Sequence, residues 1–361
     1  MAYSTISKPG LHFNTVTYTG NGGTNAITGV GFQPDLVWTK NRSSAQNHLL
    51  YDVVRGVGYY LYPNLQNAQG GNGTGGLDSF DSNGFTLDGG DDSNVNGENG
   101  VAWSWKAGNS AGSANTDGTI NSTVSVNTTA GFSIVKYTGG GSAGTVGHGL
   151  SAAPEVVILK SISGSDVWVT YHKGIDATAP ADYFIQLQST AARTNNADFF
   201  SDTLPTNQVF SIGANSAVSN NGSSFMAYCF AEKKGYSKFG KYIGNGNADG
   251  TFVYTGFKPA WVMIKSTSSG SNKSWSIFDT TRQTFNPNVN KTLYANRNEP
   301  EGRRGSGSTS STIPAIDMLS NGFKCRVGND EVNTTNDYIY MAFAAEPLVA
   351  NVGQGIPATA R

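Results

Sequence analysis

The chain has 361 residues, of which 46 are glycine, 14% are charged and 11% are aromatic. This length favours two or three domains over a single core, and the aromatic content is too high for a disordered chain. The formal net charge of −1 gives no basic footprint for nucleic acid or for an anionic membrane surface, so we expect neither as a partner.

Residues 1–12 are predicted to form an N-terminal arm. They lack the basic flank and the apolar core of a signal peptide. No apolar stretch of the chain approaches the roughly 20 residues that cross a bilayer. We therefore expect synthesis in a host cytoplasm without membrane insertion.

Residues 13–107 are predicted to form a first β module of short strands and tight turns. A strand at 13–18 ends in a tyrosine, and Pro34 then opens an apolar strand that ends in Lys40. Further strands are expected at 49–52, 83–87 and 101–105. Asn-Gly pairs punctuate these runs and are typical of hairpin turns.

The same landmarks recur in the same order in a second module, 131–235, and a third, 236–348. The tyrosine, proline and lysine landmarks are Tyr18, Pro34 and Lys40, then Tyr137, Pro154 and Lys160, then Tyr242, Pro259 and Lys265. Tyrosine precedes proline by 16, 17 and 17 residues, and proline precedes lysine by 6 in all three. The closing strands align as 101–105, 226–230 and 341–344. This repeat predicts an all-β fold of three tandem antiparallel β-sandwich modules, jelly-roll-like in character.

Two further segments lie outside the predicted modules. Residues 108–130 are rich in Ser, Asn, Thr and Gly and are expected to be a polar linker. Residues 349–361 contain Gly and Pro and are expected to be an extended C-terminal tail.

Several strings of the chain resemble a known family. They are the stretches 32–42, 51–56, 79–85, 101–107 and 356–361. They are similar to a repeat domain of marine bacteriophage structural and tail-fibre-like proteins, a family that is defined by sequence and not by activity. The resemblance spans nearly the whole chain. It implies a virion component and carries over no catalytic residues.

The sequence gives little support to catalysis. The four histidines, His12, His48, His148 and His172, do not recur across the repeats, and no nucleophile elbow or metalloprotease helix motif is present. We expect no enzyme, no cofactor and no metal. A pair of carboxylates of the glycosidase kind is the one arrangement that a sequence never excludes.

One charged pair does recur. Asp52 and Arg55 have the same spacing as Asp279 and Arg282, whereas the second module has His172 at the equivalent position. A ligand-binding dyad is one interpretation. A structural turn held by a carboxylate–guanidinium pair is the favoured one, because such turns are common.

Two stretches resemble half of a calcium loop. Residues 92–97 have the spacing Asp-x-Asn-x-Asn-Gly, but Trp103 stands where a bidentate Glu is required. Residues 245–250 have a similar spacing and also lack the acid. Ordinary hairpin turns explain both stretches better than an oxygen-ligand site does.

Surface contacts are the remaining candidates. Tyr59, Tyr60 and Tyr62 could stack on a sugar or a partner, although Tyr60 and Tyr62 would also fit one buried face of a strand. Arg303 and Arg304 lie in a long Ser/Gly-rich loop and are candidate partner contacts. The residues expected in the core are Trp38, Trp103, Trp105, Trp261, Cys229 and Cys325.

The leading hypothesis is therefore a non-enzymatic bacteriophage structural protein exposed on the virion, as a tail fibre, an appendage or a capsid decoration. Its expected partners are other virion proteins, further copies of itself with a trimer favoured, and a host surface glycan. The alternatives are a carbohydrate-binding lectin-like module and a polysaccharide-degrading tail spike.

Overall fold

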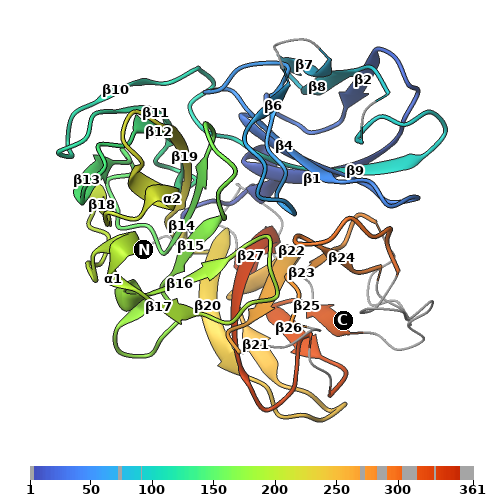
Figure 1. The fold of residues 1–361 in the computed structure, drawn as a ribbon. Helices are drawn as coiled ribbons and strands as arrows, with labels where there is room; N and C mark the ends of the chain where they lie inside the picture. Colours follow the sequence, from blue (N-terminus) through green and yellow to red (C-terminus); the bar gives the residue numbers. More distant parts are fainter. Residues whose placement is uncertain are drawn as a thin grey trace.

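The described part of the chain folds into antiparallel β-sheets with only short helical turns, as the computed structural model shows (Figure 1). The structure describes residues 4–71, 75–90, 92–268, 273–282, 291–302, 315–328 and 331–349. The all-β prediction is confirmed. The helical turns are η1 (Pro9–Leu11), η2 (Pro180–Asp182), α1 (Ala197–Phe200) and α2 (Ser216–Ser219).

The first segment, residues 13–107, contains a large sheet and a small sheet. The large sheet has the order β1 (Phe13–Thr19), β9 (Asn99–Trp105), β3 (Leu36–Asn41), β4 (His48–Asp52). The small sheet has the order β2 (Asn25–Thr28), β8 (Gly84–Asp88), β7 (Gly76–Asp81). A separate pair joins β5 (Tyr59–Tyr60) to β6 (Gly70–Gly71).

The second segment, residues 131–235, repeats this order. Its large sheet contains β12 (Phe132–Thr138), β19 (Ser224–Phe230), β14 (Val156–Ser161), β15 (Val169–His172), β16 (Tyr183–Gln186) and β17 (Thr194–Asn195). Its small sheet pairs β13 (Gly144–Gly147) with β18 (Val209–Ile212).

The third segment, residues 236–348, does so again. Its large sheet contains β20 (Ser237–Ile243), β27 (Asp337–Pro347), β22 (Phe257–Ser266), β23 (Ser276–Asp279) and β24 (Leu293–Tyr294). Its small sheet contains β21 (Phe252–Tyr254), β26 (Gly322–Cys325) and β25 (Ile316–Leu319).

Residues 108–130 are not the polar linker that their composition predicts. They contain β10 (Ser113–Asn115) and β11 (Ser122–Asn127), which extend the large sheet of the second segment beyond β12. Ser122, Val124 and Ser125 of β11 are buried. The pattern is short and mostly Ser and Thr, so composition alone does not distinguish it from a loop.

The closing strand of the third segment is shifted by two residues from its predicted alignment. Ile339 pairs with Lys265 in the way that Val101 pairs with Lys40, so 339–343 is the true equivalent of 101–105. A shift of two residues keeps every side chain on the same face of a strand. The alternation of apolar residues therefore fits both alignments equally well.

The three large sheets share one hydrophobic core. It includes Trp103 of the first segment, Tyr228 of the second and Phe343 of the third. A separate apolar cluster belongs to each segment, where its large sheet faces its small sheet. The expected core tryptophans are buried, and both cysteines are buried and free, as predicted.

The recurring Tyr-x-Gly motif has the same role in each segment. The phenol groups of Tyr18, Tyr137 and Tyr242 donate to the backbone carbonyls of Ser93, Val218 and Val332, over 2.6 to 2.8 Å. The glycine two residues later runs against backbone, and a Cβ there would collide with a carbonyl oxygen. Each tyrosine thus fixes the loop that precedes the closing strand. Each glycine lets the backbone of that loop lie close to the end of the first strand of the segment.

We predict that Gly20→Ala destabilises the protein, because its methyl group would overlap the carbonyl oxygen of Val95. Overpacking of this kind typically costs about 1–3 kcal/mol. Gly23→Ala is the matched control, since no atom lies within 4 Å of a Cβ at that position. Urea denaturation of the two variants measures the difference, and equal midpoints would contradict the role of Gly20.

Candidate functional site

The Asp52–Arg55 turn is a buried contact between two segments, and we call each such contact a joint. Arg55 Nε lies 2.6 Å from Asp52 Oδ2, and both side chains are almost fully buried. The same Asp52 oxygen accepts a hydrogen bond from the hydroxyl group of Tyr228, over 2.8 Å. The turn therefore belongs to the first segment and holds Tyr228 of the second segment through this hydrogen bond.

The equivalent turns of the other two segments complete a ring. Asp279 Oδ2 lies 2.5 Å from Arg282 Nε and accepts the indole N–H of Trp103 over 3.0 Å, which joins the third segment to the first. His172 stands in the second segment. Its Nε2 is 3.0 Å from the carbonyl oxygen of Tyr340, which joins the second segment to the third.

The His172 ring is neutral in this joint. Its Nδ1 accepts the amide of Gly174 over 3.0 Å, which leaves Nε2 to carry the proton and donate to Tyr340. Burial lowers the pKa of His172 to about 4. The second segment thus has a neutral donor where the other two segments have an acid, and this donor also contacts the next segment of the ring.

The recurring lysines form a second set of buried groups. Lys40, Lys160 and Lys265 have no exposed surface. Each Nζ donates to the carbonyl of the next residue over 2.6 to 2.7 Å. Lys40 also donates to Asn298 O at 3.1 Å and Lys265 to Thr190 O at 3.5 Å, both in a neighbouring segment. Burial lowers the pKa values of Lys40 and Lys265 to about 7 and that of Lys160 to about 8.

Of the tyrosine cluster, the two alternating members pack inward. The rings of Tyr60 and Tyr62 are 5.2 Å apart and lie against the apolar cluster between the sheets of the first segment. Gly70 pairs with Tyr60 and has no room for a Cβ beneath that ring. Tyr59 is half-buried, and a partner contact of Tyr59 stays a prediction.

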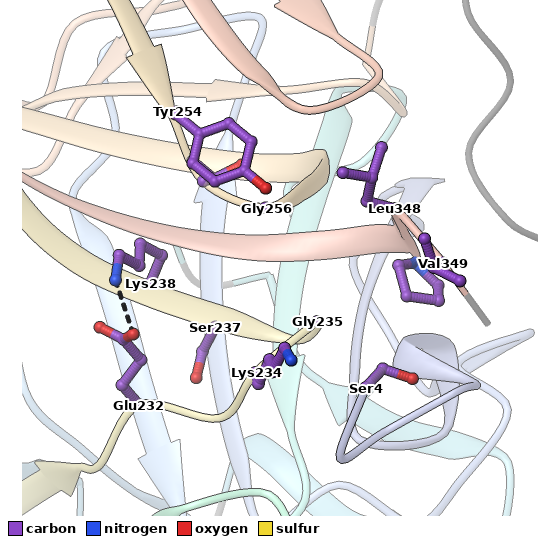
Figure 2. Close-up of a pocket in the computed structure, with 12 residues that line it drawn as sticks. Ser4, Glu232, Lys234, Gly235, Ser237, Lys238, Tyr254, Gly256, Leu348 and Val349 are labelled. Carbon is purple, nitrogen blue, oxygen red and sulfur yellow. Dashed lines mark hydrogen bonds and ion pairs between the residues drawn. The ribbon is translucent and has the colours of Figure 1, made fainter. Parts of the chain in front are cut away.

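A cavity of about 310 Å³ lies where the second and third segments meet (Figure 2). Tyr254 stands at its edge with 55% of its surface exposed, and Leu348 and Val349 form another side. Glu232 lies on its wall and binds Lys238 at 2.7 Å. The cavity is thus lined by an aromatic ring, aliphatic side chains and the Glu232–Lys238 ion pair.

A family model describes nearly the whole of this architecture. The model "Domain of unknown function (DUF7483)" matches residues 8–347. The chain belongs to the DUF7483 family. No curated protein and no solved structure matches the chain, and the family description names no activity.

The calcium-like stretches of the DUF7483 domain are explained by buried asparagines. Asn94 Nδ2 donates to the carbonyls of Gly23 and Gly89, over 2.7 and 2.9 Å. Asn333 Nδ2 donates in the same way to Asn247 and Val327, over 2.8 and 2.9 Å. Both asparagines are fully buried. The stretches therefore close loops, which agrees with the preferred interpretation as turns.

Two expectations from the sequence concern absent features, and two concern residues that the structure does not describe. In the part of the domain that the structure describes, no three His, Cys, Asp or Glu side chains gather as metal ligands would. No helix among the same residues is long and apolar enough to span a bilayer. Arg303 and Arg304 lie outside the described residues, as do residues 350–361 of the predicted tail.

Sequence reasoning missed the exposed apolar residues of the third segment. Ile243 is 67% exposed, Phe252 45% and Tyr254 55%. They stand in strands that read as ordinary alternating β-strands, so only a comparison with the other two repeats marks them as unusual.

We predict that Asp52→Ala destabilises the DUF7483 domain by about 3–5 kcal/mol, because it leaves the Arg55 guanidinium buried without its partner. Asp249→Ala is the control, since Asp249 pairs with Lys324 on the surface. Its loss should barely move the urea midpoint. An equal decrease in the free energy of unfolding for both variants would show that burial does not strengthen the Asp52–Arg55 ion pair.

The buried lysines predict a stability that rises with pH. An unfolded lysine has a pKa of about 10.4, whereas burial lowers the pKa values of Lys40 and Lys265 to about 7. Between these values the unfolded chain binds protons that the folded chain does not, so the free energy of unfolding increases from about pH 7 to about pH 10.4.

Urea midpoints across that window measure the slope. Lys40→Met should reduce it, because this substitution removes one of the three buried lysines whose pKa values are lowered. Lys173→Met is the control for the loss of a lysine side chain, because Lys173 is more than a third exposed. A flat profile for the unmodified protein would refute the lowered pKa values.

Proposed function

We propose that this chain is a non-enzymatic bacteriophage structural protein exposed on the virion, where it acts through assembly and surface attachment. The observation that carries the proposal is the ring of joints. Three of the buried groups that could support chemistry, Asp52, His172 and Asp279, are each bound to a neighbouring segment. The use of two buried acids and one buried histidine to join the segments favours a rigid body.

The same ring supports a division into three tandem β-sandwich modules. Each segment contributes a large sheet and a small sheet with an apolar cluster between them. Four strands of each large sheet have the same order in all three segments. In this proposal the modules are copies of one unit, and the shared core makes them a single body.

The location on the particle, as a tail fibre, an appendage or a capsid decoration, is proposed from the resemblance to phage structural proteins. The same resemblance favours a homo-oligomer, with a trimer as the expected state. Other virion proteins and a host surface glycan are the proposed partners.

A carbohydrate-binding function is the second candidate. The observation that favours it is the Tyr254 ring, which is exposed beside the cavity of about 310 Å³. Exposed aromatic rings are suited to stacking on sugars. A polysaccharide-degrading site has less support, because Glu155 and Glu232 both bind Lys173 and their charges are already partnered.

Immunogold electron microscopy of purified particles tests the virion proposal. Antibodies against the recombinant chain should label the particle surface, on the tail for a fibre and on the head for a decoration protein. Particles that contain no copy of the chain by mass spectrometry would overturn the proposal. Screening the chain on a glycan array would then test the lectin alternative.

A further inference from the structure

The cavity between the second and third segments has an aromatic wall that stands on a fixed turn. Tyr254 ends β21, and its ring lies over Gly256, where a Cβ would be 3.6 Å from the phenol oxygen. Gly256 has a φ of +80°, a backbone conformation that other residues rarely adopt. The amides of Thr255 and Gly256 both donate to the carbonyl of Asn321, over 2.9 and 3.2 Å. The turn that carries the ring is therefore held in place before a ligand binds.

The Tyr254 ring is accessible to a ligand. It is 55% exposed, and its hydroxyl group forms no hydrogen bond within the described residues. Figure 2 shows the ring and Lys234 on different sides of the cavity, with Leu348 and Val349 on a third side. An exposed aromatic face beside a cavity is suited to stacking on the C–H face of a sugar ring.

This aromatic ring is specific to the third segment. The small sheets of the three segments align through the inward-facing pairs Val253–Phe323, Ile27–Phe85 and Val146–Phe210. The residue that follows the first member of each pair is Tyr254 in the third segment, Thr28 in the first and Gly147 in the second. Neither threonine nor glycine provides a ring. The repeat thus presents this stacking surface once per chain and not three times.

The charged groups at the cavity leave one positive charge in excess. Glu232 binds Lys238 at 2.7 Å and Lys173 at 3.1 Å. Glu155 also binds Lys173, at 3.3 Å, so these two carboxylates and two ammonium groups cancel. Lys234 lines the cavity, is exposed, and forms no ion pair in the part of the chain that the structure describes. Its ammonium group is available to an anionic group of a ligand.

The size and the charge of the cavity limit the ligand. Its volume of about 310 Å³ is at the lower end of the range for ligand pockets, roughly 300–1,000 Å³. A phosphate monoester carries a charge of about −1.5 to −2 at pH 7, which is more than one lysine balances. A sugar carboxylate carries a single charge, and the ring that bears it has an apolar C–H face for the aromatic wall.

We propose that this cavity binds a carboxylated sugar, which is a uronic or sialic acid residue of a glycan. The sugar ring stacks on Tyr254, and its carboxylate forms an ion pair with Lys234. The inference rests on the attachment to a glycan that is proposed above. It adds the chemical class of the sugar and the residues that bind it.

A panel of paired oligosaccharides tests the proposal. Its carboxylated members are oligomers of glucuronate, galacturonate and mannuronate, together with sialyllactose. Each has a counterpart in which the carboxylate is reduced to a primary alcohol. The full chain is screened on the immobilised panel, and affinities are then measured by isothermal titration calorimetry. At least one carboxylated member should bind about tenfold more tightly than its reduced counterpart, with one site per chain.

Variants of the aromatic wall test the stacking. Tyr254→Thr introduces the residue of the first segment and should weaken binding about tenfold or more. Tyr254→Phe retains the ring and should retain most of the affinity. Phe252→Ala is the matched control, because Phe252 is 45% exposed on the same strand but does not line the cavity. It should leave sugar binding unchanged.

Variants of the lysine test the charge. Lys234→Gln should remove the preference for the carboxylated sugar over its reduced counterpart, whereas a merely structural role would weaken the binding of both. Lys234→Arg should keep the preference, because it keeps the positive charge. Lys241→Gln is the control, since Lys241 is exposed on β20 but does not line the cavity. All these variants should melt at the temperature of the unmodified chain, because the substituted side chains are exposed.

The possible failures are distinguishable. Absence of binding to every carboxylated member at millimolar concentration would overturn the proposal. Equal binding of carboxylated and reduced sugars that Tyr254→Thr abolishes would retain carbohydrate binding and refute the choice of an acidic sugar. Binding that Tyr254→Thr leaves unchanged would retain attachment to glycans and refute this cavity as the site. None of these results depends on finding the chain on particles, so the virion proposal fails separately.

Discussion

Burial of the three large sheets on both faces is the constraint on which the rest of the structure depends. Each large sheet meets the shared core on one face and its own small sheet on the other. Every residue of β3 and β14 is buried as a result. Water cannot reach polar groups at such positions, so each must find a partner inside the protein. The joints between segments and the hydrogen bonds from the three lysines to backbone carbonyls provide such partners.

The same constraint explains how far the sequence could be interpreted. Strands, the lysine landmark and the buried tryptophans follow from local pattern, because the period of two and the apolar runs are strong signals. The contacts between segments do not follow from local sequence pattern. Tyr228 meets Asp52 across 176 residues, and no local rule relates such positions. The register of β27 was also out of reach, because a shift by two residues leaves the inward face unchanged.

The comparison of the three segments nevertheless gives information that a single segment would lack. Where all three segments keep a residue type, as with Tyr18, Tyr137 and Tyr242, the structure gives that residue a common packing role. Where one segment departs from the others, two cases arise. His172 is a buried departure that preserves a joint. Tyr254 is an exposed departure, and surface function is the simplest physical reason for it.

The arrangement of the described chain ends has a consequence for topology. Ser4 and Val349 line the same cavity (Figure 2), and the amide of Thr5 donates to Lys234 O over 2.9 Å at the junction of the second and third segments. Because the segments close into a ring and these two positions meet, the linear order of the segments is not fixed by their packing. A short peptide that joined the two positions would allow the chain to be opened between other segments. A circularly permuted gene would then encode the same fold with its termini between two other segments.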